Sequence, residues 1–142
     1  MRRVLFLCTG NSARSQMAEA LLRADGGDEW KVRSAGTDPK GLNPLTVVAM
    51  AEVGVDVSGA ESKHRDRFLN EPWDYVITVC DDAAETCPMF PGGRLRLHWS
   101  TPDPAAASGS NEDRLAAFRA ARDSLRARIT ELRDQPMDEQ RT

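Results

Sequence analysis

A cysteine and an arginine six positions apart enclose a run of small and polar residues near the start of the chain. The run reads Cys8-Thr-Gly-Asn-Ser-Ala-Arg14-Ser15 and follows the apolar segment Val4 to Leu7. Apolar residues then recur at helical spacing, which predicts a strand, a tight loop and a helix. Such a loop presents backbone N–H groups to an anion, and Gly10 permits the turn. We therefore expect a tetrahedral oxyanion to be bound by Thr9, Gly10, Asn11, Ser12, Ala13 and Arg14.

Cys8 and Arg14 would supply the chemistry of this loop. The planar guanidinium of Arg14 matches two oxygens of a tetrahedral oxyanion. The helix N-terminus and the guanidinium favour the nucleophilic thiolate form of Cys8, and Ser15 is placed to donate a hydrogen bond to the sulfur. The alternative is a structural cysteine, because free cysteines are among the most buried residues. The agreement of motif and context favours the nucleophile.

Two further cysteines follow a second apolar segment. Cys80 ends the segment 74–79, and Cys87 comes seven residues later, after acidic and small residues that favour a short helix. Seven helical residues rise about 10 Å, whereas the Cα atoms of a disulfide lie within about 7 Å, so a Cys80–Cys87 disulfide requires unwinding. Spacing alone leaves a redox pair and two unrelated thiols open, and it disfavours a zinc site. If segment 74–79 runs parallel to the first strand, Cys8 shares its sheet edge with Cys80, which favours the redox pair.

Length and composition describe an ordinary soluble domain. The chain has 142 residues, of which 40% are hydrophobic and 29% charged. Its net charge of −3 does not indicate binding to nucleic acid or to an anionic membrane. No apolar run is long enough for a membrane span or a signal peptide. We expect a cytoplasmic protein, in which a disulfide is transient or catalytic.

Strand patterns alternate with helix patterns along the chain. Strands are expected over 3–7, 30–34, 74–79 and 95–99, and helices over 15–24, over 44–53 and from 112 onward. This alternation predicts a three-layer α/β domain in which a four-stranded parallel sheet is flanked by helices on both faces. Residues 1–134 would form a single catalytic domain, and 135–142 a polar tail. We expect a monomer, because no apolar helix face is left unpaired.

In such sheets the ligand lies at the carboxyl ends of the strands, where the strand order reverses. The loop from Cys8 to Ser15 lies at that edge. Asp103, between two prolines, is a candidate general acid for an anion pocket, although a simple turn aspartate has the same pattern.

The chain from Val4 to Leu132 resembles the thioredoxin-coupled arsenate reductases built on the low-molecular-weight protein tyrosine phosphatase fold. The resemblance rests on four segments. These are the loop from Cys8 to Ser15, Ser34-Ala35-Gly36, the segment from Val79 to Met89, and His98-Trp99 followed by Asp103-Pro104-Ala105. The three cysteines separate this group from ordinary phosphatases of the fold, which also tend to carry aromatic residues where Ala105, Ala106 and Ala107 stand here.

The resemblance implies a cascade of disulfides. The Cys8 thiolate attacks the arsenic of bound arsenate, and Asp103 protonates the departing hydroxyl. Cys80 then attacks the Cys8 sulfur and arsenite leaves, after which Cys87 attacks Cys80 and frees Cys8. Electrons come from thioredoxin and no cofactor is bound. Two alternatives remain: a low-molecular-weight phosphatase with protective thiols, and a non-enzymatic redox sensor of oxyanions.

One position departs from the pattern of these relatives. Some of them bind potassium behind the loop through groups that match Asn11, Glu19 and Ser34, together with an acidic side chain. This chain has Lys63 at the acidic position. The resemblance then implies that the Lys63 ammonium replaces the ion and bonds Glu19 and Asn11, that no metal is held, and that potassium does not activate the protein.

Overall fold

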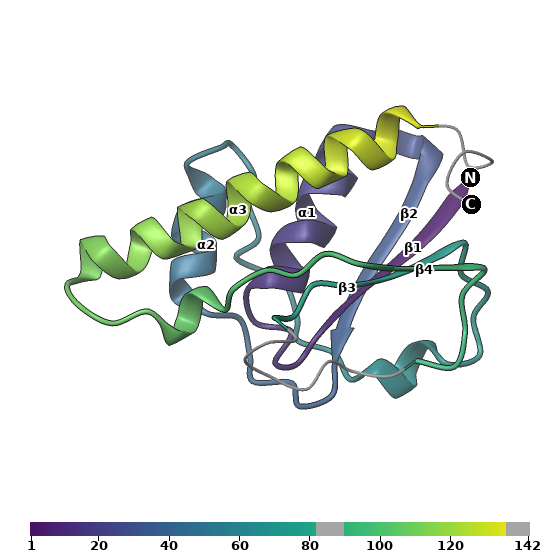
Figure 1. Ribbon diagram of the computed structural model, residues 1–142, viewed down its shortest axis with the longest axis horizontal. Helices are drawn as coiled ribbons and strands as arrows, with labels where there is room; N and C mark the ends of the chain where they lie inside the picture. The colour runs from purple at the N-terminus through teal and green to yellow at the C-terminus, as the bar shows by residue number, and fades with distance from the viewer. Residues whose placement is uncertain (82–89, 136–142) are drawn as a thin grey trace.

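The computed structural model describes residues 1–81 and 90–135. Four strands form one parallel sheet in the order β2-β1-β3-β4 (Figure 1). They are β1 (Arg2–Cys8), β2 (Trp30–Gly36), β3 (Tyr75–Thr78) and β4 (Leu95–His98). The predicted α/β class with a four-stranded parallel sheet is confirmed. β1 lies in the middle and is buried from Val4 to Cys8, as a near-continuous apolar strand of a parallel sheet should be.

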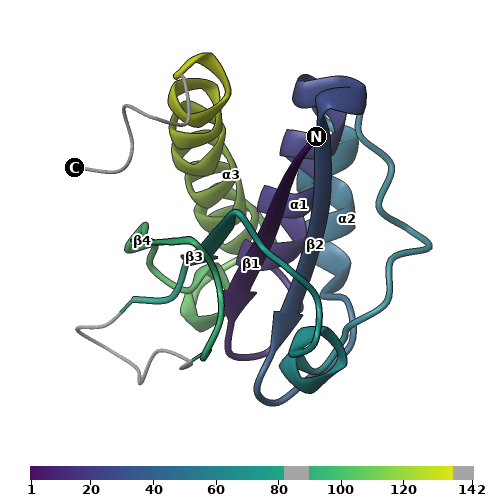
Figure 2. The ribbon, with the colours of Figure 1, turned by 90° about the vertical axis from the view of Figure 1, so that its right-hand side faces the viewer.

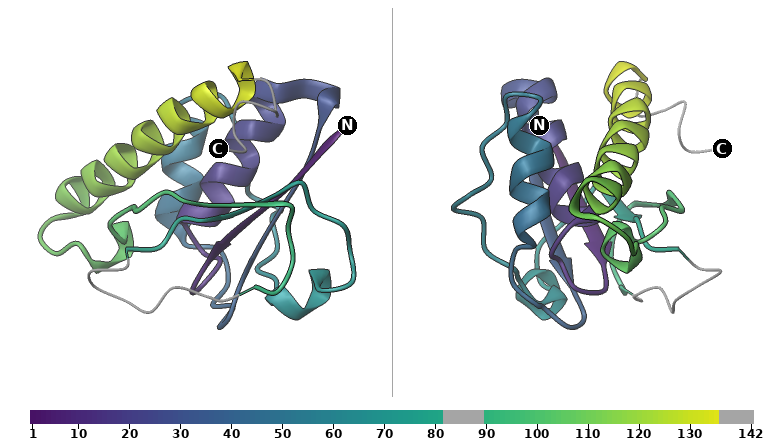
Figure 3. Two further views of the ribbon diagram at one scale, coloured as in Figure 1. Left: turned by 45° about the vertical axis from the view of Figure 1, so that its right-hand side comes forward. Right: turned by 90° about the vertical axis from the view of Figure 1, so that its left-hand side faces the viewer.

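Three α-helices cover one face of the sheet. They are α1 (Arg14–Gly26), α2 (Pro44–Ala51) and α3 (Asn111–Asp134), and Figures 2 and 3 show them grouped on the same side. The main core forms where α1 and α3 meet β1. Its largest fully buried side chains include Phe6, Met17, Leu21, Phe118, Leu125 and Ile129.

Within the described residues, the opposite face of the sheet is covered differently from the prediction, which placed helices on both faces. Leu5, Leu7 and Val76 point to this face and pack against Phe68, Trp73 and Phe90. Among the described residues, this cover is the short 3-10 helix η2 (Arg65–Phe68) with its flanking loops rather than a long helix. The chain between α2 and β3 has no sustained apolar period of 3.6 residues, so it covers the sheet with isolated large side chains.

The helix starts differ in a way that matters for the site. Asn43 caps α2 by accepting a hydrogen bond from the Leu45 N–H at 2.9 Å, and Ser110 and Asp113 form a capping box at the start of α3. In contrast, α1 begins after Ala13 with no side-chain cap. The start of α1 therefore presents its partial positive charge with no capping side chain in front of it.

The end of the described chain leaves the domain boundary as a prediction. α3 ends at Asp134, and residues 136–142, which include most of the predicted tail, lie outside the described ranges. No helix within those ranges is both long and apolar enough to cross a membrane.

Gly36, at the end of β2, lies against the backbone of the predicted anion loop. It pairs with Cys8 in the sheet. A Cβ atom at this position would be 2.3 Å from the carbonyl oxygen of Thr9 and 3.0 Å from the backbone nitrogen of Asn11. Any larger residue must therefore move the loop itself.

Replacing Gly36→Ala should lower the free energy of unfolding by about 1–3 kcal/mol, as overpacking of a rigid site does. Urea unfolding measures this change. Gly59→Ala is the matched control, because nothing lies within 4 Å of the Cβ atom it adds. Equal stability losses in the two variants would contradict a tight contact at Gly36.

Candidate active site

The loop that follows β1 lies at the reversal point of the sheet. After β1 the chain pairs β2 on one side, and it later returns to pair β3 on the other side. Open parallel sheets bind ligands at this point, outside the carboxyl ends of the strands. The structure therefore places the stretch from Cys8 to Ser15 where the sequence predicts it.

The backbone carbonyl groups of this loop accept hydrogen bonds from the segment of chain that follows β2. The carbonyl oxygens of Thr9, Gly10 and Ser12 each accept a hydrogen bond at 3.0 Å from a backbone N–H of the segment that follows β2. The donors are Asp38, Lys40 and Asn43. With its carbonyls held outward and the uncapped start of α1 at its end, the loop suits an anion on its inner side.

Asn11 holds the loop in an unusual backbone conformation. Its φ of 47° is the one positive value recorded for a residue other than glycine in the described chain, and asparagine tolerates this region better than most residues. The buried Asn11 side chain donates to Ser15 Oγ at 2.8 Å and to Ser34 Oγ at 2.9 Å. Its Oδ1 accepts from the Lys63 backbone N–H at 2.8 Å.

Cys8 is at the base of the loop, next to Ser15. Cys8 Sγ lies 2.8 Å from Ser15 Oγ, and both residues are buried. Cys8 is a free thiol. This is the contact expected of a hydroxyl that supports a nucleophilic sulfur.

Arg14 brings a distant aspartate to the mouth of the loop. The Arg14 side chain is 4% exposed. Its guanidinium donates to the Thr101 carbonyl oxygen at 3.1 Å, and its Nη2 atom lies 4.0 Å from Asp103 Oδ2. Asp103 is 42% exposed and also accepts from the Ala105 N–H at 3.0 Å. A partly exposed carboxyl beside the anion-binding cation is suitably placed to exchange a proton with solvent and ligand.

Cys80 follows the strand next to β1. Pairing continues one residue past β3, because the Val79 N–H donates to the Leu7 carbonyl oxygen at 2.9 Å. Cys8, the last residue of β1, and Cys80, which follows Val79, therefore lie at the same ends of neighbouring strands, and such strands lie about 4.8 Å apart. Cys80 is buried and disulfide-bonded. Cys87, the third cysteine of the predicted cascade, lies outside the described residues.

A buried carboxylate with two cations lies behind the loop. Glu19 accepts hydrogen bonds from Ser34 Oγ and, at 2.5 Å, from Arg23. The Lys63 ammonium is 3.6 Å from Glu19 Oε1, as expected. The expected bond from this ammonium to Asn11 is wrong, because Nζ donates to the Glu61 carbonyl and the Lys63 backbone N–H meets Asn11 instead. Burial lowers the pKa of Lys63, and the charge of Glu19 opposes that effect.

No cluster of three or more histidine, cysteine or acidic side chains is arranged to hold a metal ion within the described ranges.

Sequence reasoning missed Gln16 and Thr101. The Gln16 amide bonds Asn11 and Glu61, and the only signal for it was a polar residue one turn before Glu19. Thr101 acts through its backbone carbonyl, which a sequence pattern cannot reveal.

Comparison with known proteins decides the family. The model of the family described as low molecular weight phosphotyrosine protein phosphatase matches residues 3–142. The chain belongs to this family. Two relatives are named arsenate reductase. That of Bacillus subtilis is 48% identical over 128 residues, covering 90% of this chain and 92% of the relative, and that of Halalkalibacterium halodurans is 47% identical over 126 residues, covering 89% and 91%.

Solved structures of similar proteins share the fold of this chain. One, described as an arsenate reductase in the phosphate binding state, superposes with a TM-score of 0.79 and 30% identity, covering 94% of this chain and 97% of the other. Another is a thioredoxin-dependent arsenate reductase of Corynebacterium glutamicum, with a TM-score of 0.69 and 33% identity. This chain covers 60% of that protein, and 93% of this chain is matched.

Potassium should have no specific effect on this family member, because the Lys63 ammonium already lies beside Glu19. Thermal unfolding in matched potassium and sodium chloride measures this, and the two midpoints should coincide. The Lys63→Ser variant should gain a potassium-specific rise in the midpoint, since it leaves the Glu19 carboxylate without that ammonium. A potassium-specific rise in the unmodified protein would contradict the assignment.

Proposed function

We propose that this protein is a thioredoxin-coupled arsenate reductase. The observation that carries the proposal is that Cys8, the last residue of β1 and the base of an oxyanion loop, and Cys80, two residues after β3, lie at the same ends of neighbouring parallel strands. A phosphatase uses one thiol, whereas a two-electron reduction that ends in a disulfide requires two thiols that can meet. The names of the relatives, at 47–48% identity, support the same activity.

Arsenate binding would use the loop and Arg14 together. The outward bonds of the loop carbonyls suit a loop whose N–H side faces the oxyanion, and the start of α1 adds partial positive charge. The bond from Arg14 to the Thr101 carbonyl fixes the guanidinium plane. A guanidinium fixed in this way can bond two oxygens of the anion without first being ordered.

The first chemical step forms a bond between Cys8 Sγ and arsenic. The thiolate supplies the electron pair, and one oxygen of arsenate leaves as water after Asp103 provides its proton. Asp103 is placed for this role by its position 4.0 Å from Arg14 at the loop mouth. Arsenic remains pentavalent at this stage.

The second step transfers two electrons. The Cys80 thiolate attacks Cys8 Sγ, a disulfide forms between the two cysteines, and the electron pair of the breaking sulfur–arsenic bond reduces arsenic to arsenite. Cys87 then attacks Cys80 and returns Cys8 to its free form. A free Cys8 beside a disulfide-bonded Cys80 is the state expected after this transfer.

A dithiol protein must then reduce Cys80, and thioredoxin is the proposed donor. The structural relative from Corynebacterium glutamicum is described as thioredoxin-dependent. No bound cofactor is required, because each electron pair is carried by sulfur.

The Cys87→Ser variant should release about one arsenite per enzyme and then stop, because the Cys8–Cys80 disulfide has no internal thiol to resolve it. Arsenate-dependent NADPH oxidation with thioredoxin and thioredoxin reductase measures turnover, and mass spectrometry identifies the trapped disulfide. Cys8→Ser should form no arsenite at all.

Hydrolysis of p-nitrophenyl phosphate is the control for an intact loop. Cys87→Ser should retain whatever slow hydrolysis the parent shows, because Cys8, Arg14 and Asp103 are unchanged. Parent-like arsenate turnover by Cys87→Ser would refute the cascade.

A phosphatase remains the second candidate, because the oxyanion loop and Asp103 serve that reaction equally well. The segment after Asp103 argues against a phosphotyrosine substrate. The 3-10 helix η3 (Pro104–Ala106) presents exposed alanines here and no aromatic side chain. Repeated arsenite production in the coupled assay would also exclude a sensor that is not an enzyme.

A further inference from the structure

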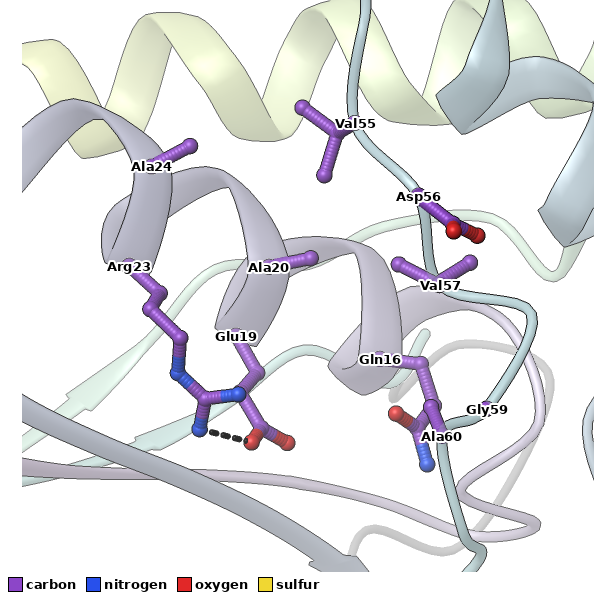
Figure 4. Close-up of a pocket in the computed structure, with 10 residues that line it drawn as sticks. All are labelled: Gln16, Glu19, Ala20, Arg23, Ala24, Val55, Asp56, Val57, Gly59 and Ala60. Carbon is purple, nitrogen blue, oxygen red and sulfur yellow. Dashed lines mark hydrogen bonds and ion pairs between the residues drawn. The ribbon is translucent and has the colours of Figure 1, made fainter.

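Gln16 lies in the first turn of α1 and is 3% exposed. Its side chain leaves the same side of the helix as Glu19 and reaches toward Gly59 and Ala60, where it forms part of the wall of a pocket of about 400 Å³ (Figure 4). The reaction steps above use Cys8, Arg14 and Asp103 but give no role to Gln16.

Three oxygen atoms surround the amide nitrogen of Gln16. Nε2 donates to Asn11 Oδ1 at 3.0 Å, to the Asn11 carbonyl at 3.3 Å and to the Glu61 carbonyl at 2.9 Å. Only an N–H donor is stable facing three acceptors, so the orientation of the Gln16 amide is fixed.

The orientation of Gln16 fixes that of Asn11. Asn11 Oδ1 accepts from Gln16 Nε2 and from the Lys63 backbone N–H. The other end of the Asn11 amide, Nδ2, must therefore face away and donate its two hydrogens. It donates them to Ser15 Oγ and Ser34 Oγ.

The orientation of Asn11 in turn fixes the hydroxyl of Ser15. Ser15 Oγ accepts from Asn11 Nδ2 at 2.8 Å and lies 2.8 Å from Cys8 Sγ. Because an amide N–H can only donate, the hydroxyl hydrogen is left to point at the sulfur. A hydrogen bond donated to a sulfur anion stabilises that anion.

We propose that Gln16 is a positioning residue that, through Asn11, directs the hydroxyl hydrogen of Ser15 onto Cys8 Sγ. A carboxylate in place of the amide would set an acceptor against Asn11 Oδ1. The Asn11 amide would then turn over, the Ser15 hydroxyl would donate to the rotated Asn11 oxygen, and the sulfur would lose its donor.

The other charged groups around Cys8 stay the same in this comparison. Arg14 and Asp103 lie at the loop mouth, Glu19 and Lys63 lie behind the loop, and Asp81 follows Cys80 at the end of the neighbouring strand. The Ala20→Glu variant is the control for added negative charge. It introduces a carboxylate in the same pocket, one turn farther along α1, so it shows how much charge alone changes the reactivity of Cys8.

The test measures alkylation of Cys8 by neutral iodoacetamide across a range of pH. The full chain carries three cysteines, so a Cys80→Ser, Cys87→Ser background leaves Cys8 as the one thiol. Gln16→Glu should slow alkylation about tenfold on the acid side and raise the pH of half-maximal rate by about one unit. The plateau rate at high pH should not fall, since a thiolate of higher pKa is at least as nucleophilic. Gln16→Met should shift the curve in the same direction by less, because the Lys63 N–H still orients Asn11.

Adding Ser15→Ala separates this chain of hydrogen bonds from general damage to the loop. In that background, Gln16→Glu should cause no further shift, because the hydroxyl it acts through is gone. Three results would overturn the proposal. Gln16→Glu could leave the pH dependence of Cys8 alkylation unshifted, it could shift it equally in the Ser15→Ala background, or Ala20→Glu could shift it as much as Gln16→Glu does. If circular dichroism shows Gln16→Glu to be unfolded, an unshifted Gln16→Met curve overturns it. Alkylation needs no arsenate, so this outcome is independent of the proposed reductase activity.

Discussion

The left-handed backbone of Asn11 is the constraint on which the site depends. A positive φ at a residue other than glycine persists only where surrounding bonds hold it, and here each polar atom of the Asn11 side chain is bonded inside the protein. The loop carbonyls are held outward by the next segment of chain. The shape of the anion site is thus present before any anion arrives, so its binding energy is not used to order the loop.

The sheet contributes the second requirement, which is proximity of sulfurs from distant parts of the sequence. Cys8 and Cys80 are 72 residues apart in the chain, yet parallel pairing of β1 with β3 brings them to the same edge. This pairing is possible because the chain crosses from one side of β1 to the other. The same crossing creates the opening in which the oxyanion loop lies. One topological feature therefore places both the anion site and the second thiol.

Much of this arrangement could be predicted from sequence, because its determinants are local. The apolar run before Cys8, the small residues of the loop and the helical period after Arg14 specify strand, loop and helix. What could not be predicted depends on backbone atoms and on packing. The Thr101 carbonyl that holds Arg14 has no signature, and neither does the use of the Lys63 backbone rather than its ammonium at Asn11. The second face of the sheet is covered by large side chains from loops. Loops have no helical or strand periodicity, so the sequence pattern could not predict this cover.

Because no side chain caps α1, the oxyanion of the proposed reaction would take the place of that cap. An anion bound at the partial positive charge of the helix start stabilises the folded chain, so ligand occupancy and folding stability are thermodynamically linked. A cradle of this kind recognises tetrahedral geometry and negative charge, which phosphate shares with arsenate. Selectivity between the two anions then depends on the sulfur chemistry that follows binding, because thiols are strong enough reductants to convert arsenate to arsenite but not to reduce phosphate.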